Sequence, residues 1–294
     1  MTSRPPHLCR SWLLIGGIDR RGLAEVHGCG ADVAVLELED FTPPEARAEA
    51  RAAAPALFDA WRAAGIVPAV RVNPFFDGGR DDLAAVMAGA PEIVMLPKLR
   101  GPEEVVALDQ AVTEEETRRG LTPGATRLVP NCEIAAALLS TREIARASDR
   151  VIGCLLASED LATDLGAPRT RESGEIDFAR AYFHAACTAE GVVSIDCPYT
   201  FADAEGHEAH CARAAALGYR AKSLVAPAHA RLVNAAFTPD AAQVAQARRI
   251  VEAAAEARAR GEARALLDGH LVEVPTLRNA ETVLERAEAL VALG

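Results

Sequence analysis

Residues 149–167, DRVIGCLLASEDLATDLGA, carry the pattern that decides the fold. The first half is almost continuously apolar, which is typical of a β-strand covered on both faces. The second half has the composition of a helix, and its acidic residues Glu159, Asp160 and Asp164 stand at and just after the junction. A buried strand followed at once by a helix is the repeating unit of a parallel α/β sheet.

The same unit recurs along most of the chain. Apolar runs alternate with Ala-rich helical segments; the runs are SWLLIGG (11–17), DVAVLELE (32–39), VPAVRVN (67–73), EIVMLPK (92–98), TRLVPNCE (126–133), DRVIGCLLA (149–157), GVVSIDCPY (191–199) and YRAKSLVA (219–226). Eight such units close most simply into a (β/α)8 TIM barrel, which uses about 250 residues. An open doubly wound sheet is the alternative, but IGGIDRRG only poorly approximates the glycine-rich turn that it favours.

The pattern changes after the eighth run. The segments AHARLVNAAF and PDAAQVAQARRIVEAAAEARARG are helical, ALLDGHLVEVP interrupts them, and TLRNAETVLERAEALVAL is a final helix. This tail is too long to be the last helix of a barrel. We therefore expect a barrel domain over residues 1–235 and a helical extension over 236–294 that covers a barrel mouth, its own or a neighbour's.

Composition excludes several classes of function. The 294 residues carry a formal net charge of −11 and no basic block, which argues against a nucleic-acid surface. No apolar run reaches the roughly 18 residues of a membrane span, and MTSRPPHLCR lacks the apolar stretch of a signal peptide. The seven Cys form no CxxC pair and lie mostly in apolar segments, as in reducing compartments. These features predict a cytoplasmic protein that binds neither nucleic acid nor membrane.

Polar side chains gather where the predicted strands end. In chain order they are Glu37, Glu39, Asp40, Arg71, Asn73, Lys98, Glu133, Glu159, Asp160, Asp196 and Tyr199. One such residue alone is readily explained as a cap of the next helix. Because the carboxyl ends of barrel strands form the active-site face, so many on one rim instead indicate a site.

A rim with several carboxylates calls for a compensating cation, because like charges raise one another's pKa. Glu133 and Asp160, from adjacent strands, suit Mg²⁺, which takes one or two carboxylates and leaves its other positions to water and substrate oxygens. Mn²⁺ is an alternative occupant, whereas the lack of His on these strand ends argues against zinc. Arg71 supplies a planar cation for a carboxylate or a developing oxyanion.

At these residues the sequence resembles the citrate lyase beta-subunit family, within the HpcH/HpaI aldolase/citrate lyase superfamily that includes malyl-CoA and citramalyl-CoA lyases. The matching segments, in family order, are RSWLLIGG, GADVAVLELED, VRVNP, VMLPK, NCEIAAAL, ASEDLATDLGAPRT, SIDCPY, LGYRAKSL, NAAFTP and LDGHLVEVP. EDLATDLG together with RVNP is the specific part. The resemblance implies a TIM barrel whose C-terminal lid reaches a neighbouring subunit's active site, usually in a homotrimer or a hexamer.

The resemblance also implies a reaction: magnesium-dependent, reversible cleavage of a 3-hydroxyacyl-CoA into an acetyl-type CoA thioester and a small 2-oxo acid. Glu133 and Asp160 match the family's magnesium ligands, and Arg71 matches the arginine that holds the substrate and its enolate-like oxygen. Glu39 and Asp40 match an acidic pair that orients water and ligands. Further substrate contacts are expected from Arg10, near the acyl thioester, and from Asn73 and Lys98.

Four positions depart from the family pattern. Gly16 replaces a proline, Cys197 a glycine and Ala226 a histidine. Glu273 stands where the lid usually carries the Asp that serves as acid/base group across the subunit interface. Glu273 can make the same proton transfer, but its added methylene shifts the carboxyl group, and a misplacement of about 1 Å can cost about a hundredfold in rate.

Three alternatives remain open. The chain could hydrolyse the thioester, act as a class I aldolase with Lys98 as a Schiff base, or be a non-catalytic subunit or ligand-binding relative. Of the remaining residues, we expect His207 and His210 at the surface, and Trp12, Phe75 and Cys132 in the packed core.

Overall fold

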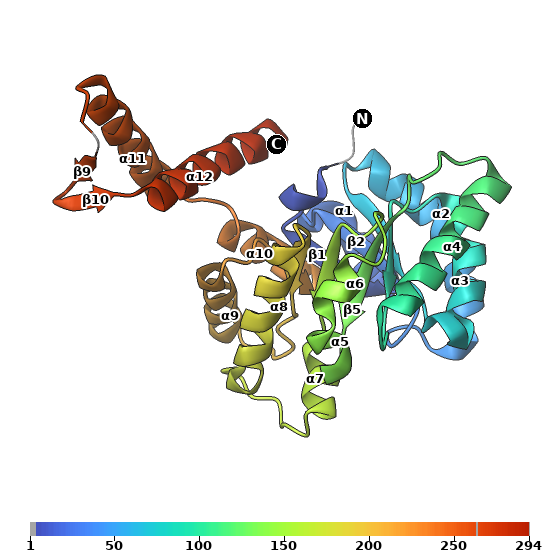
Figure 1. The fold of residues 1–294 in the computed structure, drawn as a ribbon. Coiled ribbons are helices and arrows are strands. Elements are labelled where there is room, and N and C mark those ends of the chain that lie inside the picture. Colours follow the sequence, from blue (N-terminus) through green and yellow to red (C-terminus); the bar gives the residue numbers. More distant parts are fainter. Residues whose placement is uncertain (1–3, 263, 294) are drawn as a thin grey trace. The chain divides into compact units, whose positions relative to one another are not determined.

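In the computed structural model, which describes residues 4–262 and 264–293, eight parallel strands form a closed barrel in chain order (Figure 1). The strands are β1 (Ser11–Gly16), β2 (Val33–Glu37), β3 (Val67–Arg71), β4 (Ile93–Leu96), β5 (Arg127–Cys132), β6 (Gly153–Leu156), β7 (Val193–Asp196) and β8 (Ala221–Leu224). The barrel closes where β8 pairs with β1, with Ser11 opposite Lys222. The predicted TIM barrel is confirmed, and each predicted strand is present.

Helices surround the barrel (Figure 1). They are α1 (Arg20–Cys29), α2 (Arg47–Ala63), α3 (Arg80–Val86), α4 (Pro102–Arg119), α5 (Ala135–Leu139), α6 (Thr141–Ala145), α7 (Ser158–Asp164), α8 (Asp177–Ala189), α9 (Ala204–Leu217) and α10 (Ala230–Ala236). Short helical turns add η1 (Pro6–Leu8), η2 (Pro44–Ala46), η3 (Phe75–Gly79), η4 (Met87–Gly89), η5 (Gly174–Ile176) and η6 (Pro227–His229). Among the described residues, no helix combines the length and apolarity that a membrane span requires.

The alternation of strand side chains sorts the barrel into two cores, because successive residues of a strand point to opposite faces. The inner core takes every second residue of the strands, among them Trp12, Leu14, Val33, Val35, Val67, Ala69, Ile93, Met95, Val129, Leu155, Ile195 and Ala221. The residues between them pack against the helices in an outer core that includes Phe75 and Cys132. Trp12, Phe75 and Cys132 are buried, so their assignment to the core is confirmed.

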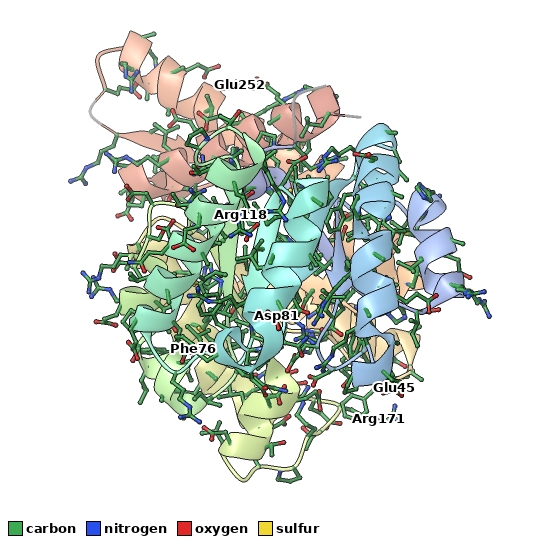
Figure 2. The ribbon with its side chains drawn as sticks, turned by 90° about the vertical axis from the view of Figure 1, so that its right-hand side faces the viewer. Glu45, Phe76, Asp81, Arg118, Arg171 and Glu252 are labelled. Carbon is green, nitrogen blue, oxygen red and sulfur yellow. The ribbon has the colours of Figure 1, made fainter. Side chains whose placement is uncertain are left out.

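The inward-facing rows end in polar residues at the carboxyl ends of the strands. Glu37 continues the row of Val33 and Val35, and Arg71 continues the row of Val67 and Ala69. Figure 2 shows Glu45, Phe76 and Arg171, from loops of this face, toward the lower end of the barrel, while Arg118 at the end of α4 lies toward the upper end. The strand-end residues therefore share one mouth.

Thr238–Gly294 forms a compact unit of its own. The boundary between the two units follows Phe237, whereas the sequence pattern placed this boundary after residue 235. Its elements are α11 (Ala241–Ala259), β9 (Ala265–Leu267), β10 (His270–Val272) and α12 (Val274–Leu293). A capping box between Asp240 and Gln243 starts α11. The segment expected as a break is a hairpin: Asp268 and Gly269, at φ 51° and 80°, have the positive φ of a two-residue type I′ turn.

Candidate active site

Arg71 is the central cation of the mouth. It ends β3 with only 6% of its surface exposed, and its Nε donates to Glu37 Oε1 at 2.9 Å. Glu37 is fully buried at the end of β2 and also accepts the backbone N–H groups of Glu39 at 2.7 Å and Phe41 at 2.5 Å. These bonds fix the carboxylate, and the carboxylate in turn fixes the plane of the guanidinium.

Three more carboxylates lie around the outer edge of that guanidinium. Nη2 of Arg71 is 3.2 Å from Glu39 Oε2 and 3.8 Å from Asp40 Oδ2, and Nη1 is 3.6 Å from Glu133 Oε1. These ion pairs are mostly longer than an N–H···O hydrogen bond, so the terminal nitrogens keep donor capacity for a substrate oxygen. Burial disfavours the charge, but Glu37, Glu39 and Glu133 together raise the pKa of Arg71 above its usual value.

Lys98 faces the acidic pair, Glu39 and Asp40, from the loop after β4. It follows β4 with a left-handed φ of 50°, and its ammonium pairs with Glu39 and, at 3.1 Å, with Asp40 Oδ1. Burial opposes the charge, but these two carboxylates raise the pKa of Lys98 above its ordinary value. Burial also raises the pKa of Glu39, against the pull of Arg71 and Lys98. A protonated amine does not attack a carbonyl, so this geometry disfavours the Schiff-base alternative.

Glu133 and Asp160 are the candidate metal ligands. Glu133 is fully buried just after β5, and its Oε2 accepts the backbone N–H of Lys98 at 3.0 Å. Burial raises the pKa of Glu133 to about 7; Arg71 opposes this shift, and the carboxylates of Glu39 and Asp160 add to it. Asp160 is half-buried in the first turn of α7. The Glu133 carboxylate is buried and its pKa is raised, and Asp160 is close enough to add to this shift. Such a pair of carboxylates suits a divalent cation that takes oxygen ligands.

Known proteins are similar in sequence to this chain over nearly its whole length. The family model described as HpcH/HpaI aldolase/citrate lyase matches residues 10–227. The chain belongs to this family. The citrate lyase subunit beta of Haemophilus influenzae is 32% identical over 96% of this chain and 98% of the relative. The L-malyl-CoA/beta-methylmalyl-CoA lyase of Cereibacter sphaeroides is 30% identical over 98% of this chain and 96% of the relative. The resemblance seen in the sequence is confirmed, and with it an enzyme of the aldolase and lyase type.

A solved structure agrees with this assignment. The CitE protein of Mycobacterium tuberculosis, in complex with magnesium, acetoacetate and coenzyme A, matches with a TM-score of 0.77 at 27% identity. The match covers 95% of this chain and 98% of that one.

In this HpcH/HpaI family member, the acidic residues that flank Asp160 hold α7 in place. Glu159 Oε1 accepts from Arg169 Nε at 3.0 Å, so the start of the helix is tied to the loop that follows it. Asp164 Oδ2 accepts the backbone N–H of Ala135 at 2.8 Å and ties the end of the helix to α5. Arg169, which the sequence did not single out, thus positions the segment that carries Asp160.

Arg10 lies at the wrong end of the barrel for its predicted role. It precedes β1, and since all eight strands run parallel, the residue before a strand lies a strand's length from the mouth. Its backbone N–H and Nε donate to Asp32 Oδ2 at 2.7 and 2.9 Å, at the amino ends of β1 and β2. The predicted contact of Arg10 with the acyl thioester is wrong in this structure.

Asn73 has a structural role, and its predicted substrate contact stays a prediction. It is 2% exposed, and its Nδ2 donates to the Leu38 carbonyl at 3.0 Å and to Asp82 Oδ2 at 2.7 Å. These bonds clamp the segment after β3 onto the segment after β2 and onto α3. Both N–H groups of the amide are therefore engaged within the protein and are not free to donate to a substrate.

Asp196 was expected among the mouth residues, and this expectation is wrong. It follows the inward-facing Ile195, so its side chain points outward beneath the helices. Arg180 of α8 donates to both of its carboxylate oxygens at 2.9 Å, and Lys222 of β8 donates to Oδ2 at 2.7 Å. Burial disfavours the charge, but Lys222 and Arg180 hold the pKa of Asp196 well below its usual range.

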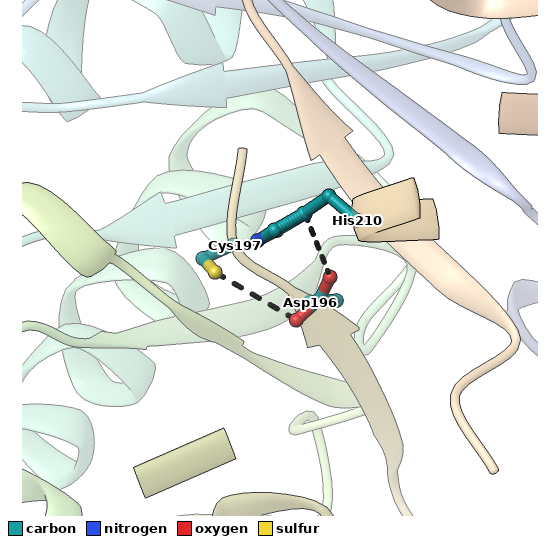
Figure 3. A group of neighbouring side chains, drawn as sticks. All are labelled: Asp196, Cys197 and His210. Atoms are coloured by element: carbon teal, nitrogen blue, oxygen red, sulfur yellow. Dashed lines mark hydrogen bonds and ion pairs between the residues drawn. The ribbon is translucent and has the colours of Figure 1, made fainter. Parts of the chain in front are cut away.

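Asp196, Cys197 and His210 lie close enough to suggest a metal site (Figure 3). However, Lys222 Nζ is 2.7 Å from both Asp196 Oδ2 and His210 Nδ1, so its ammonium takes the place of a metal ion. Burial also raises the pKa of the Cys197 thiol to about 11, which keeps it protonated. The group is an ion-pair network. His207 and His210 are 1% and 4% exposed on the inner face of α9, so their predicted surface location is wrong.

Glu273 belongs to the C-terminal unit. It lies between β10 and α12 with an exposed side chain, and its carbonyl accepts the N–H of Leu277 in the first turn of α12. The carboxyl group is thus accessible from solvent. Its predicted action on a neighbouring barrel stays a prediction.

Proposed function

We propose that this chain is a magnesium-dependent carbon–carbon lyase or synthase that acts on a malyl-CoA- or citramalyl-CoA-like 3-hydroxyacyl-CoA. The products of cleavage would be an acetyl-type CoA thioester and a small 2-oxo acid. One observation carries the proposal: Arg71, oriented by Glu37, faces the buried carboxylate of Glu133, which has Asp160 beside it. The names of the related lyases support it.

The residues divide the work between two halves of the substrate. Glu133 and Asp160 would hold Mg²⁺, or Mn²⁺ in its place, which supplies a Lewis acid and a template for the oxo-acid oxygens. Arg71 would bind the thioester carbonyl oxygen through the donors that its ion pairs leave available, and it would stabilise the negative charge that develops there. Lys98 would hold Glu39 and Asp40 in place at the edge of this site and contact a substrate carboxylate.

In the cleavage direction, the hydroxyl proton would pass to water held by Glu39 and Asp40, and the hydroxyl oxygen would become the carbonyl of the 2-oxo acid. The C2–C3 bond breaks, and its electron pair moves to the thioester carbonyl as an enolate that faces Arg71. The enolate carbon then takes a proton from Glu273, which leaves the acetyl-type thioester. The synthase direction reverses each of these steps.

We also propose that Glu273 reaches the barrel of a neighbouring chain in a homotrimer or hexamer. Its exposed place at the start of α12 supports this arrangement, since a lid that serves another barrel needs an accessible acid.

The described cysteines are all free thiols, which supports the cytoplasm as the working compartment.

The direct test is condensation. The purified protein is incubated with Mg²⁺, acetyl-CoA or propionyl-CoA, and a panel of glyoxylate, pyruvate and oxaloacetate, and the thioesters are analysed by mass spectrometry. A new thioester whose mass is the sum of the two substrates is expected, and it should disappear with EDTA and in Asp160→Asn. No condensed product with any pair would refute the lyase and favour a non-catalytic subunit.

A second candidate is thioester hydrolysis, because the (3S)-malyl-CoA thioesterase of Cereibacter sphaeroides is among the relatives. The same incubation, started from a malyl-type thioester, separates the two reactions. Free CoA together with malate would indicate hydrolysis, whereas acetyl-CoA together with glyoxylate would indicate cleavage. Lack of borohydride trapping of Lys98 is expected in both cases.

A further inference from the structure

Phe41 is an aromatic residue whose backbone is held by hydrogen bonds at the mouth. It follows the acidic pair of the β2 loop, and its side chain is 43% exposed. The centre of its ring is 5.9 Å from Cζ of Arg71, within the range of a cation–π contact. An apolar ring therefore stands next to the guanidinium that would bind the reacting thioester.

The backbone on both sides of Phe41 is fixed by Glu37. The Phe41 N–H donates to Glu37 Oε2 at 2.5 Å, and the Thr42 hydroxyl donates to the Glu37 carbonyl. The same hydroxyl accepts the N–H of Gly17 at 2.7 Å, which ties the loop to the end of β1. The backbone that carries the ring thus needs little further ordering when a ligand binds, and a preordered backbone loses less entropy.

Gly16 makes this placement possible. A Cβ added at Gly16 would collide with the Phe41 carbonyl oxygen and come within 3.1 Å of its Cβ. The missing side chain at the end of β1 is therefore the space into which the Phe41 backbone fits. This placement of Phe41 therefore requires a glycine at position 16.

The surroundings of Phe41 indicate which part of a substrate it faces. Arg71 separates the ring, on the β2 side, from Glu133 on the β5 side. The negative face of an aromatic ring repels a carboxylate, and Mg²⁺ takes oxygen ligands, so the oxo-acid half belongs with Glu133 and Asp160. The half next to the ring is the acyl group, whose carbonyl oxygen would bind Arg71.

We propose that Phe41 is a specificity-determining residue that contacts the alkyl substituent on the reacting carbon of the acyl thioester, so that propionyl-type acyl groups are favoured over acetyl. This inference rests on the proposed lyase function. An additional buried methylene changes an equilibrium or a rate by about fourfold, which sets the size of the effect to be measured.

The experiment compares kcat/KM for propionyl-CoA and acetyl-CoA with the best 2-oxo acid at saturating Mg²⁺. Phe41→Ala is expected to lower the propionyl-to-acetyl ratio about fourfold, and Phe41→Leu, which keeps an apolar group, to retain most of it. Phe178→Ala is the matched control, because Phe178 is a 73% exposed phenylalanine on α8, and it should leave the ratio unchanged.

A ratio in Phe41→Ala within about twofold of the wild-type ratio would overturn the inference and leave the lyase function standing. If Phe41→Ala melts below the assay temperature, Phe41→Gln tests the same point, because it keeps a longer side chain than alanine and removes the aromatic surface. A wild-type protein that condenses neither thioester overturns the proposed function and this inference together.

Discussion

Glu37→Gln is the sharpest test of whether the Glu37 carboxylate orients Arg71 for its role in the reaction. In the wild-type protein, one Glu37 oxygen accepts from Arg71 Nε at 2.9 Å and from the Glu39 N–H at 2.7 Å, and the other accepts from the Phe41 N–H at 2.5 Å. A glutamine has one carbonyl oxygen for these donors, and its amide group would face a second donor. The substitution removes the negative charge and sets two N–H groups against each other.

The size of the effect follows from the bond that is lost. A hydrogen bond to a charged group contributes about 1.5–3 kcal/mol, and each factor of ten in rate corresponds to about 1.4 kcal/mol. We therefore expect kcat/KM for condensation to fall about 10- to 150-fold, mostly through kcat, if Arg71 stabilises charge that develops in the transition state. The Mg²⁺ concentration for half-maximal rate should change little, because Glu133 and Asp160 are untouched.

The assay needs a control on the same loop. Glu45→Gln changes an exposed carboxylate of η2 and should leave kcat/KM unchanged. Rates are measured well below the melting temperature of each variant, so that a loss of stability does not appear as a loss of rate. A Glu37→Gln enzyme with kcat/KM within about threefold of wild type would refute the view that this bond prepares Arg71.

Three further predictions concern the metal site, the lid and the buried ion pairs. Asp160→Asn should lower Mg²⁺-dependent turnover more than about 100-fold in the condensation assay. Asp160→Asn and Glu273→Gln chains are dissociated, mixed in equal amounts and reassembled. About one quarter of the sites should regain activity if the lid serves a neighbouring barrel, and none should if it serves its own barrel. Asp196→Asn should lower the free energy of unfolding by about 3–5 kcal/mol, because it strands two buried cations, against about 0–1 kcal/mol for Asp177→Asn in a surface pair. Since the pKa of Asp196 is lowered in the fold, its contribution is present above the ordinary value of 3.8 and lost as the pH falls below it, so the melting temperatures of wild type and variant should converge in acid.

The misplacement of Asp196 and Arg10 has a geometric origin in the strands. Asp196 and Glu37 both end apolar runs, yet Glu37 faces the mouth and Asp196 faces the helices, because they belong to opposite rows of their strands. The two-residue period of each strand carries this information. Arg10 was misplaced for a related reason, since it precedes its strand and only residues that follow a strand reach the mouth.

The buried histidines show a different limit. His207 and His210 follow a polar stretch at the start of α9, and the local pattern favours the surface. Only the packing of α9 against β7 and β8 brings His210 to Lys222 and removes both rings from water. A contact between residues on different elements has no signal in either local pattern.

The sequence by itself determined the barrel and the end of the barrel at which its site lies. Continuous apolar runs alternating with helices leave few ways to bury both faces of each strand, and a parallel barrel sends every residue that follows a strand to one mouth. Arg71, Lys98, Glu133 and Asp160 could therefore be placed on that mouth from the sequence.

Tertiary structure alone decided which of the polar residues meet and what charge each carries. The carboxylate of Glu37 orients Arg71, and the charge of Lys98 is balanced by Glu39 and Asp40. Burial raises the pKa of Glu133, so that this carboxylate favours a further cation. Gly16 and Phe41 became neighbours only through the closing of β1 on the β2 loop. These properties depend on distance and burial, and both are set by side chains that are far apart in the chain and adjacent only in the folded barrel.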